Sequence, residues 1–305
     1  MKFKMKLGSP LFLLTLFVVL ACSLGSVSAA NDIHDVTIED TSTIIEHPEA
    51  NIQDSNIQNA VINSDYTSIT EGRLGTITNG RISNAVINTR LGNIIQGCNG
   101  VIQNSALNNL MINSQFGAGR NGLIFQGTET GIIQNSMLNN AIAESNGSAD
   151  IYQGHEYSGT IQDSMVNNLI KKSNYTYLYQ GTAGGTVQGS MLNNAITNSE
   201  YISILQSYTP GPQVVNEPIT NSCITNTVYK CENNFITQNN ITNSLISNAT
   251  LFSDNTTITQ TNLTGVNGCL ITLGCTNYTK TIDNLVDTNF FNLVIGNHVI
   301  FDLQW

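Results

Sequence analysis

The chain has 305 residues, a formal net charge of −10 and a pI near 4.6, and only 10% of its residues are charged. Such an acidic chain repels phosphate backbones and anionic lipid, which argues against nucleic acid and membrane surfaces as partners. Most of its polarity comes from uncharged side chains, chiefly Asn, Ser, Thr and Gln. That composition is typical of a repeat protein rather than of an enzyme.

Residues 1–30 have the pattern of a secretory signal peptide. Three lysines precede an uncharged run over 11–22, and small residues follow up to Ala30. This order predicts export, with cleavage near Ala29 or Ala30. Two alternatives stay open, an uncleaved membrane anchor and a lipoprotein that carries its lipid on Cys22. Cleavage removes three of the 11 basic residues and none of the 21 acidic ones, which leaves a net charge near −13.

The next stretch, 31–50, is acidic and contains Pro48. The end of a solenoid exposes edge strands that need protection. We therefore expect this stretch to form a polar N-terminal cap for the repeats that follow.

Residues 51–297 hold ten copies of one 14-residue pattern, whose starting points are 22 to 32 residues apart. The second residue of every copy is Ile, Val or Leu, the fourth is Asp, Asn or Gly, and the ninth is Asn in nine of ten copies. Helical repeats typically need about 34 or more residues and strong helix formers, whereas Asn, Thr and Ile favour turns and strands. The pattern therefore predicts an all-β solenoid with one repeat in each coil.

Two polar columns recur in the same register. Coils stack about 4.8 Å apart, so residues at one repeat position lie over one another and their amides can bond from coil to coil. The ninth position predicts a structural Asn ladder of Asn59, Asn84, Asn109, Asn140, Asn168, Asn194, Asn226 and Asn248, with Asn292 in the last copy. A second column, started by Glu71, predicts a structural Gln ladder of Gln96, Gln126, Gln153, Gln180, Gln206, Gln238 and Gln260.

The pattern I-x-N-S-x-[IL]-x-N recurs every 22 residues from 218 onward. It resembles the parallel β-helix repeats of the pectin-lyase-like superfamily, over about 51–305. That resemblance implies a single right-handed parallel β-helix of about ten coils. The Asn-rich chain, with a signal that ends in VSAAND, also resembles adhesin-like surface proteins of methanogenic archaea. This second resemblance implies a secreted or cell-surface protein, and neither one assigns a catalytic residue.

The residue before each Gln of the second column is expected to point outward, because side chains alternate along a strand. On three successive coils this residue is aromatic, namely Phe125, Tyr152 and Tyr179. An exposed aromatic column can stack on sugar rings or contact a partner, so we take these three residues as the ligand-binding candidates. The alternatives are that a loop covers them or that the rings only stabilise the coils. Long insertions, such as 115–123 and 207–217, are a second candidate rim.

The sequence predicts no catalytic site, no metal site and no cofactor. Its four histidines are scattered without metal-ligand spacing, and the fourth-position aspartates are several coils apart. We therefore expect a non-catalytic, adhesin-like protein that binds carbohydrate or another cell-surface protein through its lateral faces. The alternative is a carbohydrate-active enzyme on a β-helix, either a polysaccharide lyase or a glycoside hydrolase. Short threonine columns leave an ice-binding face as a third alternative.

Cysteines are few and unevenly placed. Cys223 with Cys231, and Cys269 with Cys275, are possible local disulfides, while Cys98 is expected to be a small buried residue.

Two further features concern the surface and the C-terminus. Seven N-x-[ST] sequons predict a glycoprotein, although we expect Asn248 to stay unmodified because its column points inward. Residues 298–305 alternate apolar and polar residues and end on the only Trp, which predicts a C-terminal capping strand.

Overall fold

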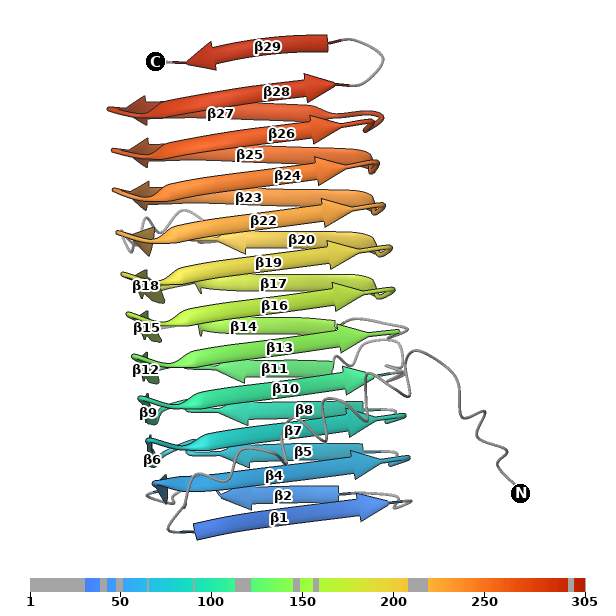
Figure 1. Ribbon diagram of the computed structural model, residues 1–305, viewed down its shortest axis with the longest axis vertical. Coiled ribbons are helices and arrows are strands. Elements are labelled where there is room, and N and C mark those ends of the chain that lie inside the picture. Colours follow the sequence, from blue (N-terminus) through green and yellow to red (C-terminus); the bar gives the residue numbers. More distant parts are fainter. Residues whose placement is uncertain are drawn as a thin grey trace, which may run out of the picture.

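The repeated aliphatic residues form short parallel strands that stack coil upon coil into a rod, as predicted (Figure 1). In this computed structural model the described part of the chain is all-β and contains no helix. The structure describes residues 31–38, 43–47, 52–64, 66–89, 91–112, 122–144, 149–155, 159–207, 219–295 and 299–304. The predicted signal segment 1–30 lies outside these residues.

One side of the rod is a twelve-stranded sheet, here called the Asn sheet because it carries the ninth-position asparagines. Neighbouring strands pair in parallel and in repeat register, except that the last strand is antiparallel to β28. The strands are β1 (Asn31–Ile38), β4 (Ser55–Ile62), β7 (Arg81–Ile87), β10 (Ala106–Ile112), β13 (Met137–Ala143), β16 (Met165–Lys171), β19 (Met191–Thr197), β22 (Cys223–Tyr229), β24 (Leu245–Leu251), β26 (Asn267–Leu273), β28 (Asn289–Ile295) and β29 (Val299–Gln304).

The other side is a seventeen-stranded sheet, here called the Gln sheet, in which long strands run through the Gln column and short strands carry the first residues of each repeat. Its long strands are β2 (Thr43–His47), β5 (Tyr66–Glu71), β8 (Leu91–Gln96), β11 (Gly122–Gln126), β14 (Ala149–His155), β17 (Asn174–Thr182), β20 (Glu200–Gln206), β23 (Glu232–Thr242), β25 (Asp254–Thr264) and β27 (Thr279–Val286). Its short strands are β3 (Ile52–Gln53), β6 (Thr76–Thr78), β9 (Val101–Gln103), β12 (Ile132–Gln134), β15 (Thr160–Gln162), β18 (Thr186–Gln188) and β21 (Ile219–Thr220).

The number of coils differs slightly from the ten expected. Within the described chain, seven coils have three separate strands, whereas in the 22-residue repeats the long and short strands join, as in β23 and β25. Within 31–50, for which we expected a cap, the structure describes β1 and β2, which pair in parallel with β4 and β5. At the other end β29 lies where the capping strand was expected.

Four aliphatic columns fill the space between the sheets. Each coil contributes one residue from its short strand, two from its Asn-sheet strand and one from its Gln-sheet strand, and nearly all are fully buried. In one coil these residues are Ile161, Val166, Ile170 and Leu178. Burial of this kind stabilises each side chain by roughly 1.5–3 kcal/mol, but only when the next coil covers it.

The fourth repeat position marks a sharp corner between strands. Its residues, such as Asn104, Asn135 and Asp163, have φ angles of 48–50°, a left-handed conformation that Asn, Asp and Gly tolerate best. The serine that follows donates to the carbonyl two residues earlier and accepts the N–H of the corner serine one coil before, as Ser136 does at 2.8 and 3.1 Å. The repeated Asn-Ser pair therefore forms a corner, and the aspartates at the fourth position adopt the same left-handed backbone conformation as the asparagines.

Both predicted amide ladders lie in the buried interior. Each Asn of the Asn ladder donates through Nδ2 to Oδ1 of the next Asn towards the C-terminus, at 2.8–3.1 Å. The Gln ladder runs the opposite way, with each Nε2 donating to the preceding Oε1 at 2.7–3.0 Å. Cross-bonds join the ladders, such as Asn168 Nδ2 to Gln153 Oε1 at 2.9 Å.

Adjacent asparagines in β16 allow a test of how much the interior ladder contributes. Asn168 belongs to the buried ladder, whereas its neighbour Asn167 bonds to Asn139 on the outer face of the same sheet. We expect Asn168→Ala to lower the free energy of unfolding by about 2–4 kcal/mol, because it strands several buried donors and acceptors. Asn167→Ala, measured by the same urea titration, should cost under about 1 kcal/mol because water replaces its partners. Equal losses would contradict this assignment.

Candidate functional site

The predicted aromatic column exists and lies on the outer face of the Gln sheet. Phe125, Tyr152 and Tyr179 are register neighbours on β11, β14 and β17, and all three are half-buried. Their rings stack with centroids 4.8 and 4.7 Å apart and planes 19° and 7° from parallel. Both faces of the central Tyr152 ring are therefore covered by its neighbours. The column presents ring edges to solvent, so it fits coil stabilisation better than stacking on a sugar.

The exposed aromatic surface is larger than the sequence predicted, and it lies mainly on β17, β20 and β23. Tyr175 and Tyr201 form a stacked pair at 4.7 Å at the start of their strands, where both have left-handed backbone. Farther along the strands, Tyr177 and Phe235 are 36% and 48% exposed. These four residues together with Tyr179 are called the aromatic face below.

Tyr177 and Phe235 stand on either side of a small residue. Both pair in register with Ser203 on the strand between them, so they lie two strand spacings apart, about 9.6 Å. The ring plane of Tyr177 is within 17° of that of Tyr179, which stacks on Tyr152 along the rod. One face of Tyr177 is thus turned towards the small Ser203. We call Tyr177, Ser203 and Phe235 the aromatic cleft.

Charged groups surround this face. Glu200, Glu232 and Asp254 form an exposed acidic column at the strand starts, in register on three coils. Asp150 is buried and holds the register position next to Tyr177, and Tyr152 donates to its Oδ2 at 3.4 Å. Lys230 lies 5.1 Å from the Tyr229 ring centroid at the nearby corner. The setting is rich in hydrogen-bond acceptors.

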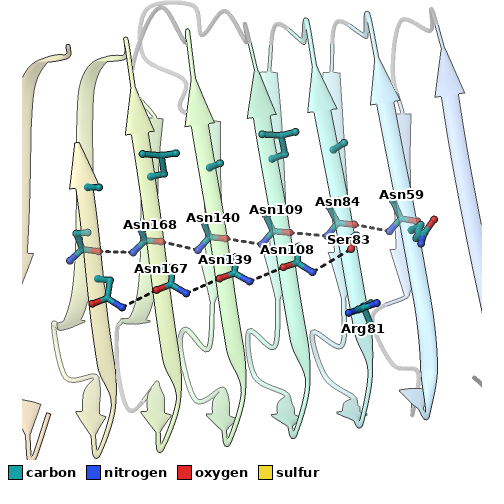
Figure 2. A pocket seen from close by; sticks show the side chains of 18 of the residues that line it. Asn59, Arg81, Ser83, Asn84, Asn108, Asn109, Asn139, Asn140, Asn167 and Asn168 are labelled. Carbon is teal, nitrogen blue, oxygen red and sulfur yellow. Dashed lines mark hydrogen bonds between the residues drawn. The ribbon is translucent and has the colours of Figure 1, made fainter. Parts of the chain in front are cut away.

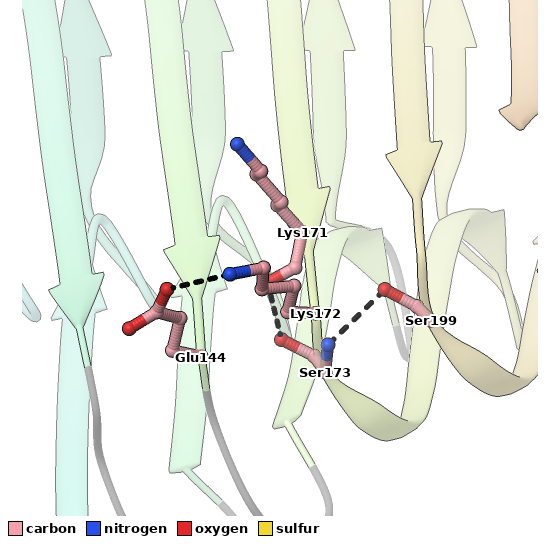
Figure 3. A network of polar contacts seen from close by, with 5 residues as sticks. All are labelled: Glu144, Lys171, Lys172, Ser173 and Ser199. Carbon is pink, nitrogen blue, oxygen red and sulfur yellow. Dashed lines mark hydrogen bonds and ion pairs between the residues drawn. The ribbon is translucent and has the colours of Figure 1, made fainter. Parts of the chain in front are cut away.

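Another corner residue in this region makes an ion pair. Lys172 Nζ lies 3.2 Å from Glu144 Oε1 on the preceding coil, and Ser173 donates its N–H to Ser199 Oγ at 3.1 Å (Figure 3). Both charged side chains are solvent-accessible, so the pair contributes about 1 kcal/mol at most. These contacts join neighbouring coils at the corner.

His155 lies at the C-terminal end of β14, behind the aromatic face. It is buried beside Tyr152 and Tyr179, with ring centroids 4.9 and 5.2 Å away, and its Nδ1 bonds to the Thr182 hydroxyl. Burial lowers the pKa of His155 to about 4. The ring is thus neutral at neutral pH and packs behind the aromatic face. The loops 115–121 and 208–217 lie outside the described residues.

A second hollow runs along the outer face of the Asn sheet from β4 to β22, with a volume of about 800 Å³ (Figure 2). Its floor is a solvent-facing amide row, in which Asn139, Asn167 and Asn193 each donate to the preceding Asn at 2.8–2.9 Å. Alanines and leucines line one side of this row. Among the described lining residues Arg81 is the single charged one.

The predicted disulfides are wrong. All five described cysteines are free. Cys223 begins β22 and Cys231 lies two residues beyond its end, so the length of the strand, about 20 Å, keeps the two thiols far beyond disulfide reach. Cys231 and Cys275 stand at the other corner of the coil, at the end of the 14-residue repeat, where Ser199 and Ser253 occupy the same position; each Sγ contacts the carbonyl two residues earlier, at 3.3 and 3.5 Å. Cys98 is buried, as predicted.

Glu71 terminates both amide ladders at their N-terminal end. Its side chain is fully buried and accepts from Asn59, Asn84 and Gln96 at 2.8–2.9 Å. Burial, opposed only in part by these bonds, raises the pKa of Glu71 from 4.5 to about 7. His47 occupies the preceding register position on β2. Asn59 lies at the start of the Asn ladder and has no Gln of the other ladder beside it. A carboxylate suits position 71 because one of its oxygens accepts from Asn59 while the other accepts from Asn84 and Gln96.

The sequence reasoning missed Tyr175, Tyr177, Tyr201 and Phe235 because it followed the column beside the glutamines alone. The signal was available, since Tyr177 lies two residues before Tyr179 and therefore on the same face. The hollow on the Asn sheet was also missed. Its signal was the repeated Met-x-Asn-x-Ala or Leu at positions six to ten.

Comparisons with known proteins give little. No family model matches the chain, and no curated protein matches it. One similar solved structure is the Streptococcus pneumoniae surface protein and adhesin PfbA, at 11% identity, 88% of this chain, 94% of that chain and a TM-score of 0.22. Another is HetL, a pentapeptide repeat protein from the cyanobacterium Nostoc. It is 9% identical, the match covers 79% of this chain and 89% of that chain, and the TM-score is 0.18. At these values neither likeness bears on function.

Metal sites and membrane-spanning helices were the other two kinds of feature to consider in the described residues. Among the described residues, no group of three or more His, Cys, Asp or Glu is placed to hold a metal ion. In that same part of the chain, no helix is long and apolar enough to span a membrane.

Glu71 generates a pH prediction. A folded-state pKa of about 7 against 4.5 means that the folded state holds this proton more tightly than the unfolded state. Its contribution is therefore fully present below pH 4.5 and declines as the pH rises to 7, by on the order of 3 kcal/mol at most. In urea titrations from pH 4.5 to 8, Glu71→Gln should remove that decline, whereas the exposed Glu232→Gln should keep it. An unchanged slope in Glu71→Gln would refute the assignment.

Proposed function

We propose that this protein is a non-catalytic, adhesin-like binding rod that acts in secreted or cell-surface form and holds a glycan on its aromatic face. The observation that carries the proposal is the aromatic cleft, in which one face of Tyr177 is turned to Ser203 and left open. The ring faces of the predicted column, by contrast, are occupied by one another. The proposal thus moves the binding site from Phe125 and Tyr152 to Tyr177 and Phe235.

The dimensions of the cleft support a ring-shaped ligand. A pyranose ring is a shallow chair that carries C–H groups on its faces and hydroxyls around its edge. Placed over Ser203, it would lie about 4.8 Å from each flanking aromatic ring, the spacing at which the Tyr152 and Tyr179 rings stack on each other. Its hydroxyls would reach the Ser203 side chain and the acidic column, which supplies acceptors. Tyr175 and Tyr201 extend the apolar surface for further sugars.

The alternative of a carbohydrate-active enzyme receives one specific observation in its favour. Glu200 and Glu232 are register neighbours on β20 and β23, and glycosidases use paired carboxylates. The general acid of such an enzyme lies in a desolvated site that keeps it protonated. Both glutamates are exposed, which favours a binding role. Release of reducing ends from a bound glycan, lost in a Glu200→Gln and Glu232→Gln double variant, would establish the enzyme instead.

Export rests on residues 1–30. The basic start, the apolar run and the small residues before Asn31 support secretion or surface display, in keeping with a net charge near −13 for the cleaved chain. We also propose, from the sequence resemblances alone, a relationship to archaeal adhesin-like proteins and to pectin-lyase-like repeats.

A substitution that fills the cleft provides the sharpest test. Ser203→Tyr would continue the column from Tyr177 to Phe235 with rings about 4.8 Å apart, as in the existing stack. We expect it to keep or slightly raise stability and to abolish glycan binding, measured on a glycan array and then by calorimetry. The double variant Tyr177→Ala with Phe235→Ala should weaken binding about tenfold or more, because it removes two stacking contacts that contribute roughly 0.5–1.5 kcal/mol each.

Two control variants separate the possible outcomes. Phe252→Ala removes an exposed aromatic ring at a corner outside the aromatic face and should leave binding unchanged. Phe125→Ala with Tyr152→Ala should lower stability more than affinity. Binding that survives Ser203→Tyr but is lost in the latter pair would return the site to the predicted column. A rod that binds no glycan on the array would remove the proposal.

A further inference from the structure

Sulfur side chains gather in one column on the outer face of the Asn sheet. They stand at the sixth repeat position of four successive strands, β13, β16, β19 and β22, which follow one another along the rod (Figure 1). In this order they are Met137, Met165, Met191 and Cys223, and all are paired in register. The one other methionine beyond residue 30 is Met111, in the core. The four residues are called the sulfur column below.

The sulfur column is open to solvent. Met137 and Met191 are 43% and 40% exposed, and Met165 and Cys223 are half-buried. Equivalent residues on neighbouring strands are about 4.8 Å apart. The methionine side chain is unbranched and rotates freely, so its Sγ can approach the Sγ of the next coil. Two neighbours can therefore place both sulfur atoms on one small ion.

The thiol of Cys223 differs from the other described thiols in its contacts. The Sγ atoms of the others each bond to a hydroxyl, a carboxylate or a backbone carbonyl; these are Cys98, Cys231, Cys269 and Cys275. Cys223 is free, and its Sγ makes no such bond with any described residue. Its thiol therefore serves no contact of the described fold and can act as a ligand.

We propose that the sulfur column binds Cu(I), tightly between Cys223 and Met191 and more weakly between Met137 and Met165. Thiolate and thioether sulfur are the soft ligands that select Cu(I) over harder cations. The thiol loses its proton on binding, and one thiolate with one Cu(I) gives a neutral centre. We expected no metal site from the histidines and aspartates, and the sulfur column supplies a different set of ligands.

Spacing and charge decide how the four ligands divide. Met165 and Cys223 are about 9.6 Å apart, too far for the short thiol arm and metal–sulfur bonds of about 2.3 Å to let both bind one ion. The ligands therefore act in pairs, and the pair with the thiolate is the stronger because its charge opposes that of the ion. Arg81 holds the sixth position two coils before Met137 and disfavours a cation at that end.

Titration of the purified full chain with Cu(I), without oxygen and against a coloured Cu(I) chelator, tests the proposal. A Cys22→Ser background removes the thiol of residues 1–30. One ion should bind tightly, with sulfur-only coordination in copper X-ray absorption spectra. Zn²⁺ should not displace it, because zinc prefers a tetrahedron of four ligands. Cys223→Ser should weaken the tight site about a hundredfold and Met191→Leu about tenfold, since loss of even an outer partner of a ligand costs about 10–100-fold.

Each of these variants has a matched control. Met111→Leu changes the core methionine of β10, and Cys269→Ser changes a half-buried thiol whose register neighbours are Ser247 and Phe291. Both controls should keep the tight site. Cys223→Ser and Met191→Leu should fold, because Leu245 and Asn267 stand at the same position on β24 and β26.

Several results would overturn the proposal. These are unchanged affinity in Cys223→Ser or Met191→Leu, loss of the tight site in Cys269→Ser, and nitrogen or oxygen ligands in the spectra. Met165→Leu should remove the weaker site alone, and loss of the tight site in that variant would overturn the pairing. Glycan binding on the Gln sheet should be unchanged in every variant, so the two proposals can fail separately.

Discussion

The structure depends on one constraint, that a polar side chain buried between stacked coils must find its partners along the rod. The strand spacing brings equivalent amides within hydrogen-bond reach, so a repeated Asn or Gln satisfies itself. The two ladders donate in opposite directions and are cross-bonded, as between Asn140 and Gln126 at 2.8 Å. Neighbouring amide chains thus oppose their dipoles, and each interior amide has partners above, below and beside it. An apolar residue in place of one ladder amide would therefore remove hydrogen bonds in its own coil and in both neighbouring coils.

The same constraint explains where the ladders stop and what stops them. At the N-terminal end Glu71 supplies one more acceptor than Gln could, at the cost of a buried carboxyl. At the C-terminal end the Asn column meets Leu270 and the Gln column meets Ile282. Beyond that point Asn292 is buried without a hydrogen-bond partner for either side-chain polar atom. The last coils therefore hold together mainly by strand pairing and apolar contact, which includes Phe290 packed over Gly268.

Much of this was readable from the sequence because repetition converts spacing into register. The ladders and the outward position of Phe125 need only alternation and a common period. The wrong disulfides arose because sequence proximity was taken for spatial proximity, whereas eight residues from Cys223 to Cys231 span a whole strand. The cleft was not predicted because it depends on ring orientation. Whether a ring face is open depends on the residue one coil away, and Ser203 lies 26 residues from Tyr177 in sequence.

This difference indicates where function lies in a stacked solenoid. Where a column repeats, each side chain is covered by its copies, and the column contributes to stability. A surface opens only where the repetition breaks, as at Ser203 between Tyr177 and Phe235, or where size alternates, as at Ala141 beside Leu169. Perfect repetition therefore marks the scaffold, and its interruptions mark the surfaces available for contact. The face proposed for glycan binding is such an interruption.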